Sequence, residues 1–185
     1  DSVRGVSERL RSDTNGAATS LSGFAFESNG FSPAHETSDQ GDSGGTFAAW
    51  NWKAGGSAVS NTNGTITSQV STNPAAGFSI VSWTHGSGSQ SIGHGLSQKP
   101  DMMIVKKRSG ISSWWTWHKG LSSETQSFIH LNTTSAAGAN ANAWNNQAPT
   151  ASVFYQKEYI LSNNDTGIAY CFHSVEGYSK VGSYD

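Results

Sequence analysis

Short runs of alternating hydrophobic and polar residues, separated by turn-forming residues, are the main pattern along this chain. Helical periodicity is confined to 3–12, a stretch too short to predict a helix. Alternation with a period of two is typical of β-strands, and strands about every ten residues indicate a sandwich. We therefore predict an all-β fold, an antiparallel β-sandwich of the jelly-roll or lectin-like type. The runs are 24–26, 46–52, 78–83, 102–106, 114–118, 128–131, 153–155 and 168–172.

The tryptophan-rich segment WWTWH places aromatic rings on both faces of one predicted strand. Trp115 and Trp117 share one face, and Trp114, Thr116 and His118 share the other. One of these faces must pack in the core. The other is either covered by a second packing layer or left exposed as a platform on which sugar rings stack. Both interpretations predict β-structure, but they differ in function.

A weak similarity between the two parts of the chain suggests an internal repeat. The segment TFAAWNW at 46–52 matches TGIAYCF at 166–172 in the pattern Ala-aromatic-x-aromatic. SDTNGAATS at 12–20 similarly resembles LNTTSAAGA at 131–139. Such self-similarity is the sequence signature of repeated structural units.

The repeat leads to a prediction of how the chain is divided. We expect 1–56 to be the C-terminal half of a preceding repeat unit, and 77–185 to be a complete unit of β-sandwich type. We expect 57–76 to connect them through a β-hairpin, because Asn63-Gly64 is a favoured hairpin turn. The chain therefore starts with a half-repeat.

Composition narrows the classes of function. Only 13% of the 185 residues are charged, and the net charge is −2, which gives no electrostatic basis for binding nucleic acid. No apolar run approaches the roughly 20 residues of a membrane helix, so we predict no membrane insertion.

The chain has 7 Trp and 8 Phe, too many large apolar groups for a disordered protein. The single Cys171 lies in an apolar run, and we expect a buried, inert thiol.

The segment GDSGG at 41–45 is the motif around the nucleophilic serine of trypsin-like proteases. That mechanism needs His and Asp partners from a larger two-barrel fold. Only 42 residues precede Ser43, and His35 is the one histidine among them. The matching segment LSNNDT at 161–166 has Asn163 in place of Ser43 and also favours a turn. We therefore interpret GDSGG as a glycine-rich turn.

Other candidate chemistry is sparse. The six histidines lack metal-binding spacing, although His85 and His94 flank a Gly/Ser loop and could meet across a hairpin. The oxygen-rich turns around Asp39, Asp42 and 163–165 carry few acidic residues for a calcium loop. No two carboxylates stand in a context typical of glycoside cleavage. We predict no metal site, no cofactor and no enzyme activity.

Three further segments carry a resemblance to a known family. They are GHGL at 93–96, KPDMMIVKKR at 99–108 and EGYSKVGSY at 176–184. With the residues around them they resemble a repeat domain of unassigned function in structural proteins of tailed phages, notably phages of marine bacteria and cyanobacteria. AWNWKAGG at 49–56 looks like the end of a preceding unit of the same kind, so the resemblance covers nearly the whole chain.

The resemblance implies a virion-associated appendage, such as a tail fibre, exposed on the surface of the particle. Units of this kind are often lectin-like β-sandwiches. We therefore expect as partners other copies of the chain or other virion proteins, and a host cell-surface glycan. The alternative is a purely architectural unit, a fibre shaft or a capsid decoration. A polysaccharide depolymerase is disfavoured, because no acid pair or catalytic triad is visible.

If the chain binds a glycan, aromatic rings and amide side chains are the groups we expect to contact it. Aromatic rings stack on sugar rings, and amides form hydrogen bonds with sugar hydroxyls. The candidate residues are Trp114, Trp144 and Tyr155 for stacking, with Asn145 and Asn146 for hydrogen bonding.

Overall fold

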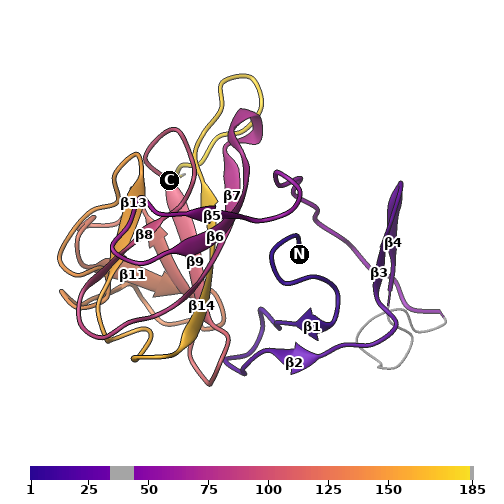
Figure 1. Cartoon of the computed structure of the whole chain (residues 1–185), viewed down its shortest axis with the longest axis horizontal. Helices are drawn as coiled ribbons and strands as arrows, with labels where there is room; N and C mark the ends of the chain where they lie inside the picture. The colour runs from indigo at the N-terminus through magenta and orange to yellow at the C-terminus, as the bar shows by residue number, and fades with distance from the viewer. Residues whose placement is uncertain (34–43, 184–185) are drawn as a thin grey trace.

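The structure, a computed structural model, describes residues 1–33 and 44–183, and its regular secondary structure is almost entirely β-strand, joined by many loops (Figure 1). All strand pairs in this part of the chain are antiparallel, apart from one isolated parallel bridge. The one helical element among the described residues is a single 3-10 turn, η1 (Pro74–Ala76). The predicted all-β, antiparallel class is confirmed. No helix in the described ranges is long and apolar enough to cross a membrane.

An eight-stranded sheet, the main sheet, forms the centre of the molecule. Its strand order is β12-β11-β10-β9-β14-β7-β6-β5. β14 lies in the middle and pairs with β7 over seven residues and with β9 over six. The strands are β5 (Val59–Asn61), β6 (Ser68–Asn73), β7 (Phe78–Thr84), β9 (Met102–Lys107), β10 (Trp115–His118), β11 (Ser127–His130), β12 (Gly138–Ala139) and β14 (Thr166–Phe172).

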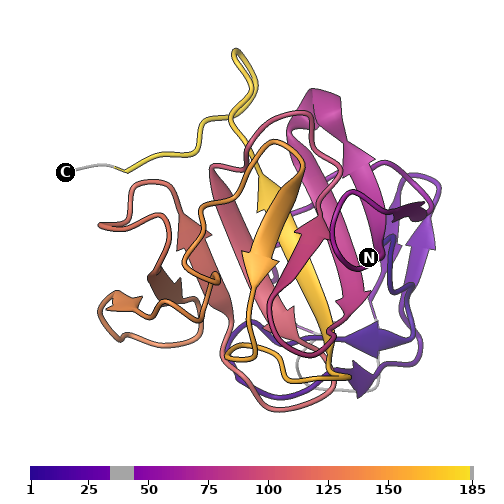
Figure 2. The same cartoon turned by 60° about the vertical axis from the view of Figure 1, so that its left-hand side comes forward.

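A two-stranded sheet covers one face of the main sheet (Figure 2). It consists of β8 (Gln90–Gly93) and β13 (Val153–Gln156), whose Ile92 and Phe154 are fully buried. These two side chains join a core cluster with Val81 and Trp117 from the main sheet. The fold is thus a sandwich of one large and one small sheet, with loops completing the smaller layer.

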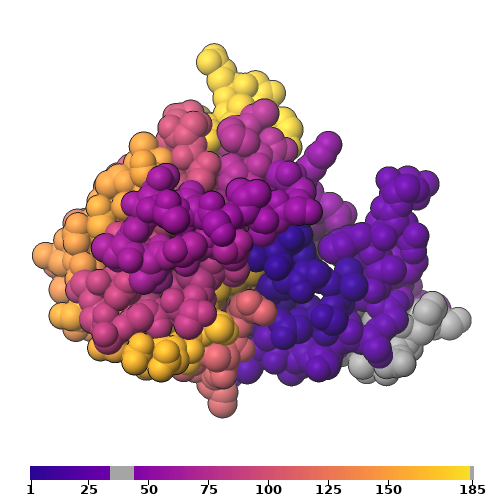
Figure 3. Space-filling view, in the orientation of Figure 1, coloured from indigo at the N-terminus to yellow at the C-terminus, as the bar shows by residue number. Residues whose placement is uncertain are grey.

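The N-terminal residues cover the opposite face of the main sheet (Figure 3, indigo). They include the short hairpin of β1 (Glu8–Arg9) and β2 (Thr19–Ser20). Val3 and Leu10 pack against a second apolar cluster that contains Phe78, Ile80 and Ile168. Residues 1–21 therefore form a third layer of the same fold, whereas the repeat hypothesis assigned them to a preceding unit.

The two segments that suggested a repeat have different structures. The segment 166–172 is β14, buried in the centre of the main sheet, but 46–52 contains no strand and its residues are exposed. Between the N-terminal layer and 46–52 lies a separate hairpin of β3 (Ala25–Glu27) and β4 (Gly30–Ser32). Sequence similarity at these positions does not translate into equivalent elements in this structure.

The hairpin predicted in 57–76 is present, and it belongs to the main sheet. β5 pairs with β6, with Val59 opposite Val70 and Asn61 opposite Ser68. Asn63-Gly64 lies in the connecting loop as predicted, but the second strand begins at Ser68. The loop is longer than a two-residue turn because Ile66 forms a parallel bridge with Ile92, which ties the loop to the small sheet.

Candidate ligand-binding surface

The structure places the first predicted sugar-binding residue, Trp114, in the interior. Its side chain is 5% exposed and lies on the face of the main sheet that the N-terminal layer covers. The indole Nε1 donates hydrogen bonds to the carbonyl oxygens of Arg11 and Thr14, at 2.8 and 3.1 Å. The ring has no face open to a sugar. The second packing layer, one of the two interpretations of the WWTWH segment, is what covers Trp114.

The other four predicted residues do not form one surface either. Trp144 is 1% exposed in the core, with Nε1 bonded to the Ser127 carbonyl at 2.9 Å. Asn145 and Asn146 form a left-handed turn whose amide oxygens already accept hydrogen bonds from other side chains. Tyr155 is half-buried on β13. The predicted set is corrected accordingly: Trp114 and Trp144 are structural, and they lie on opposite faces of the main sheet.

A different set of polar side chains lies side by side on the main sheet. Gln69 on β6 is directly opposite Ser82 on β7, and Thr84 on β7 is opposite Thr166 on β14. Side chains on β7 alternate, so Ser82 and Thr84 share the face of Phe78 and Ile80. The N-terminal layer covers the apolar half of this face. In the polar half, Gln69 and Thr84 are exposed, and Ser82 and Thr166 are partly exposed.

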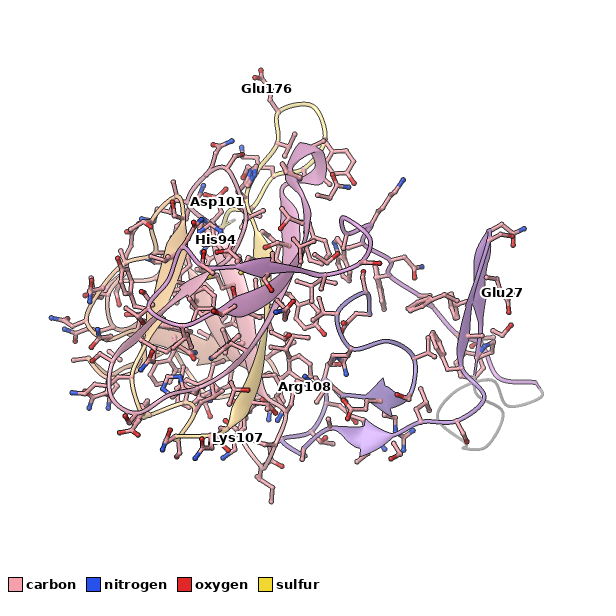
Figure 4. All side chains as sticks on the ribbon, in the orientation of Figure 1. Glu27, His94, Asp101, Lys107, Arg108 and Glu176 are labelled. Atoms are coloured by element: carbon pink, nitrogen blue, oxygen red, sulfur yellow. The ribbon has the colours of Figure 1, made fainter. Side chains whose placement is uncertain are left out.

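The uncovered half forms a hollow of about 450 Å³, which we call the sheet-face hollow. Arg108 stands at its edge, held by an ion pair of 2.7 Å between its Nη2 and Glu8 Oε2. The Nε of the same guanidinium is buried without a hydrogen-bond partner in the described structure. Figure 4 shows Arg108 and Lys107 at the same end of the sheet. The hollow is lined by Ile66, Thr67, Gln69, Ser82, Trp83, Thr84, Arg108 and Thr166.

The chemistry of this lining suits hydrogen bonding to a polar ligand. Hydroxyl and amide groups both donate and accept hydrogen bonds, and a guanidinium donates in a fixed planar fork. No His, Cys, Asp or Glu is among the lining residues, so the hollow holds no general base of the common kinds. A polyhydroxylated ligand matches such a surface because each of its hydroxyls can pair in both directions.

A second, more open hollow of about 670 Å³ lies at the C-terminal turn. Tyr178, 69% exposed, stands on a turn closed by the bridge between Val175 and Ser179. At its base, Asp101 Oδ2 accepts a 2.6 Å hydrogen bond from the Ser174 hydroxyl. Burial raises the pKa of Asp101, but these hydrogen bonds and the Lys119 ammonium outweigh it and hold the pKa below its ordinary value. Figure 4 shows Glu176 at the tip of this turn, away from the sheet.

Comparison with protein-family models assigns the whole chain to one family. Residues 1–185 match the family described as a domain of unknown function, DUF7483. The chain belongs to this family. Neither a curated protein nor a solved structure matches it. The match covers the N-terminal layer as well as the two sheets.

The histidines of this DUF7483 domain that the sequence singled out are buried. His94 Nδ1 accepts a hydrogen bond from the Leu96 N–H at 3.1 Å, and its Nε2 lies 3.1 Å from the Thr150 carbonyl. Burial lowers the pKa of His94 to about 4. Together with the left-handed Gly95, these contacts make GHGL a turn of fixed geometry, as predicted. Among the described residues, no group of three or more His, Cys, Asp or Glu side chains could hold a metal ion.

Two further candidates from the sequence have clear positions. Cys171 is fully buried in β14, so the expected burial is confirmed, and burial raises the pKa of its thiol to about 12. Ser43 and its neighbours Gly41 and Asp42 lie outside the described residues, as do His35 and Asp39. The structural interpretation of GDSGG therefore stays a prediction.

The sheet-face hollow could not be found from the sequence. Gln69, Ser82, Thr84 and Thr166 come from three strands, and each is an ordinary polar residue in a chain rich in them. Only the register of β6, β7 and β14 brings them together. The nearest signal in the sequence is the alternation in 78–83, since Ser82 stands two residues after Ile80.

Proposed function

We propose that this DUF7483 domain is a glycan-binding module of a virion appendage, such as the tail fibre of a tailed phage, and has no catalytic role. The observation that carries the binding role is the row formed by Gln69, Ser82, Thr84 and Thr166 across three adjacent strands. The virion assignment rests on the phage-like segments at 99–108 and 176–184. The module then acts on the surface of the particle.

The polar row supports sugar binding because its side chains are polar, whereas those on the rest of the same sheet face are apolar. Where the N-terminal layer covers the sheet, Phe78, Ile80 and Ile168 form an apolar cluster. The uncovered half carries hydroxyls and an amide next to Arg108, with Ile66 as an apolar contact for the ring of a sugar. A hollow of about 450 Å³ is within the range of small-ligand sites.

A binding experiment tests this proposal directly. The wild-type domain is applied to a glycan array, and binding of the strongest hit is measured by calorimetry for wild type and for Gln69→Ala. Loss of one hydrogen bond to a sugar hydroxyl is expected to weaken binding about tenfold. Thr134→Ala, an exposed hydroxyl in the loop between β11 and β12, is the matched control and should bind like wild type.

Three outcomes contradict the proposal. Equal loss of binding in Thr134→Ala would show that the hollow is not the site. Absence of any glycan hit would leave the assembly role described next. Release of reducing ends from a bacterial polysaccharide by the wild-type domain would show that the module is a depolymerase.

A purely architectural role is the second candidate, and exposed aromatic residues favour it. Trp50 is 77% exposed, and Phe26, Phe47 and Trp52 are also largely exposed within one third of the chain. Several large apolar side chains left exposed to solvent are typical of proteins that bind other protein chains. In a fibre or a capsid decoration these residues would contact neighbouring subunits.

A further inference from the structure

The main sheet has an open edge at β5. β5 is the last strand in the sheet order and has a hydrogen-bonded neighbour on one side only, β6. Strands at such an edge direct half of their N–H and C=O groups away from the sheet. Figure 1 shows β5 at the front of the molecule beside β6.

The open edge is longer than β5 itself. The Lys53 carbonyl accepts a hydrogen bond from Asn73 Nδ2 at 3.1 Å, and the Gly56 carbonyl accepts one from Ser71 Oγ at 2.6 Å. Between them, Gly55 lies so close to Thr72 that a Cβ would overlap the Thr72 carbonyl. The segment 53–61, which we call the edge segment, therefore follows β6 along its whole length and spans about 30 Å.

This edge lacks the features that keep proteins from pairing through their sheets. Exposed edges are usually protected by charged side chains, by proline or by a covering element. From 54 to 98 the chain contains no Asp, Glu, Lys or Arg, and the edge segment contains no proline. Val59, the first residue of β5, is 66% exposed. Apart from Lys53 at its first position, the edge segment presents an uncharged, partly apolar strand to solvent.

We propose that the edge segment pairs antiparallel with the edge segment of a second copy of this chain, giving a two-fold symmetric dimer with one continuous sheet. Apart from Lys53 at its end, the edge segment has no charged side chain, so no like charges meet at the two-fold axis near its middle. Pairing of identical strands needs no other surface, which is the property of an isologous interface. This inference deepens the assembly role proposed above and does not depend on the sheet-face hollow.

The flanking aromatic residues supply the area that a short strand lacks. Stable interfaces bury about 800 Å² on each partner, more than one strand edge provides. Trp52 is fixed at one end of the edge segment, with its ring centroid 6.5 Å from that of Phe78 and 6.0 Å from that of Phe172. Trp50 precedes it and is exposed. Because these rings adjoin the edge, the same dimer would bury them.

The opposite edge of the sheet is the competing partner. β12 also lies in an uncharged stretch, from 125 to 156, but it has only two residues. Pairing of β5 with β12 of another copy is head-to-tail and would build a growing filament. The longer edge favours the symmetric dimer, and the two arrangements differ in the size of the species they produce.

Sedimentation velocity over a range of concentrations tests the proposal. Wild type is expected to form a dimer and no larger species. Val59→Lys places two like charges near the two-fold axis and should raise the dissociation constant about tenfold or more. Ile111→Lys is the matched control, since Ile111 is also exposed (76%) but lies on the loop between β9 and β10. Thermal unfolding of both variants verifies that they are folded.

Cross-linking identifies the strand that pairs. Cysteines are introduced singly at Ser57, Val59 and Ser60, and Ile111→Cys is the control. The native Cys171 is buried and does not compete for oxidation. Disulfide-linked dimers are expected from at least one edge position and not from the control.

The outcomes separate the edge inference from the assembly role. If Val59→Lys dimerises like wild type but Trp50→Ser does not, the aromatic surface mediates assembly and the edge inference is wrong. Filaments that lengthen with concentration would overturn the two-fold arrangement in favour of head-to-tail pairing. A wild-type domain that stays monomeric at millimolar concentration would overturn both the edge inference and the assembly role.

Discussion

Two buried histidines, His94 and His85, are expected to make the stability of this domain depend on pH. His94 is fully buried, and its two ring nitrogens are within hydrogen-bond distance of the backbone at Leu96 and Thr150. Burial also lowers the pKa of His85, although Glu158 and Asp165 partly oppose this effect. Both side chains are neutral in the folded protein near neutral pH. In the unfolded chain, by contrast, the same groups take up protons as the pH falls below their ordinary pKa of 6.5.

The domain is therefore expected to lose stability as the pH falls below neutrality. The pKa of His94 is about 4 when folded and 6.5 when unfolded, so the unfolded state binds the extra proton between these values. The contribution of His94 is complete above pH 6.5 and is lost as the pH drops toward 4, by about 3 kcal/mol in total. Urea unfolding at a series of pH values measures this. His94→Gln should flatten the dependence, and an unchanged slope would exclude His94 as its cause.

A few contacts hold the N-terminal layer to the main sheet. Trp114 donates to two of its carbonyls, and Arg108 pairs with Glu8. Beneath it, Lys106 Nζ donates to the carbonyl of Asn15 at 3.3 Å. Burial, together with the neighbouring Lys107, lowers the pKa of Lys106 to about 8. These contacts make residues 1–21 part of the folded unit.

Trp114→Phe is expected to destabilise the domain by about 1 to 2 kcal/mol, because two buried carbonyl oxygens lose their donor. Chemical denaturation measures the effect. Trp50→Phe, at an exposed position, is the matched control and should be neutral. If Trp114 were a sugar platform, the same substitution would instead alter glycan affinity and leave stability unchanged. The two interpretations of the tryptophan-rich strand are separated by this pair of variants.

Hydrophobic alternation predicted the central strands well and the edges poorly. The runs at 78–83, 102–106 and 168–172 are β7, β9 and β14, where both faces of the sheet are packed. β6 was predicted only as part of the hairpin in 57–76, and its bounds were not, because its sequence, SQVSTN, is mostly polar. The run at 46–52 was predicted as a strand and is not one, since nothing in the described structure pairs with it. Apolar composition marks a segment that can be buried, but the burying partner is a property of the tertiary fold.

At the scale of the whole molecule, the two proposals are geometrically compatible. The edge segment would pair in the plane of the main sheet, whereas the sheet-face hollow opens on a face of that sheet. A dimer formed through the edges would therefore leave both hollows open. Two sites on one rigid particle bind a glycan-coated surface more tightly than either site alone.

The dimer should accordingly increase binding to dense glycan surfaces without changing the affinity of one site. Val59→Lys is expected to match wild type in calorimetry with a soluble sugar and to bind an immobilised glycan at least about tenfold more weakly. Surface plasmon resonance at low and high ligand density measures the difference. Equal loss in both assays would mean that the substitution damages the hollow itself.

The buried position of Cys171 allows the reactivity of its thiol to report how often the central strands of the main sheet separate. This thiol is the one sulfhydryl of the chain and sits in β14, between β7 and β9. A modifying reagent reaches it only when the centre of the main sheet separates, because fraying of the edges or of the N-terminal layer leaves these three strands together. The rate of labelling at low denaturant therefore measures how often the whole domain opens. Ligand or dimer formation can be detected, without any added probe, as a slower reaction of this single sulfur atom.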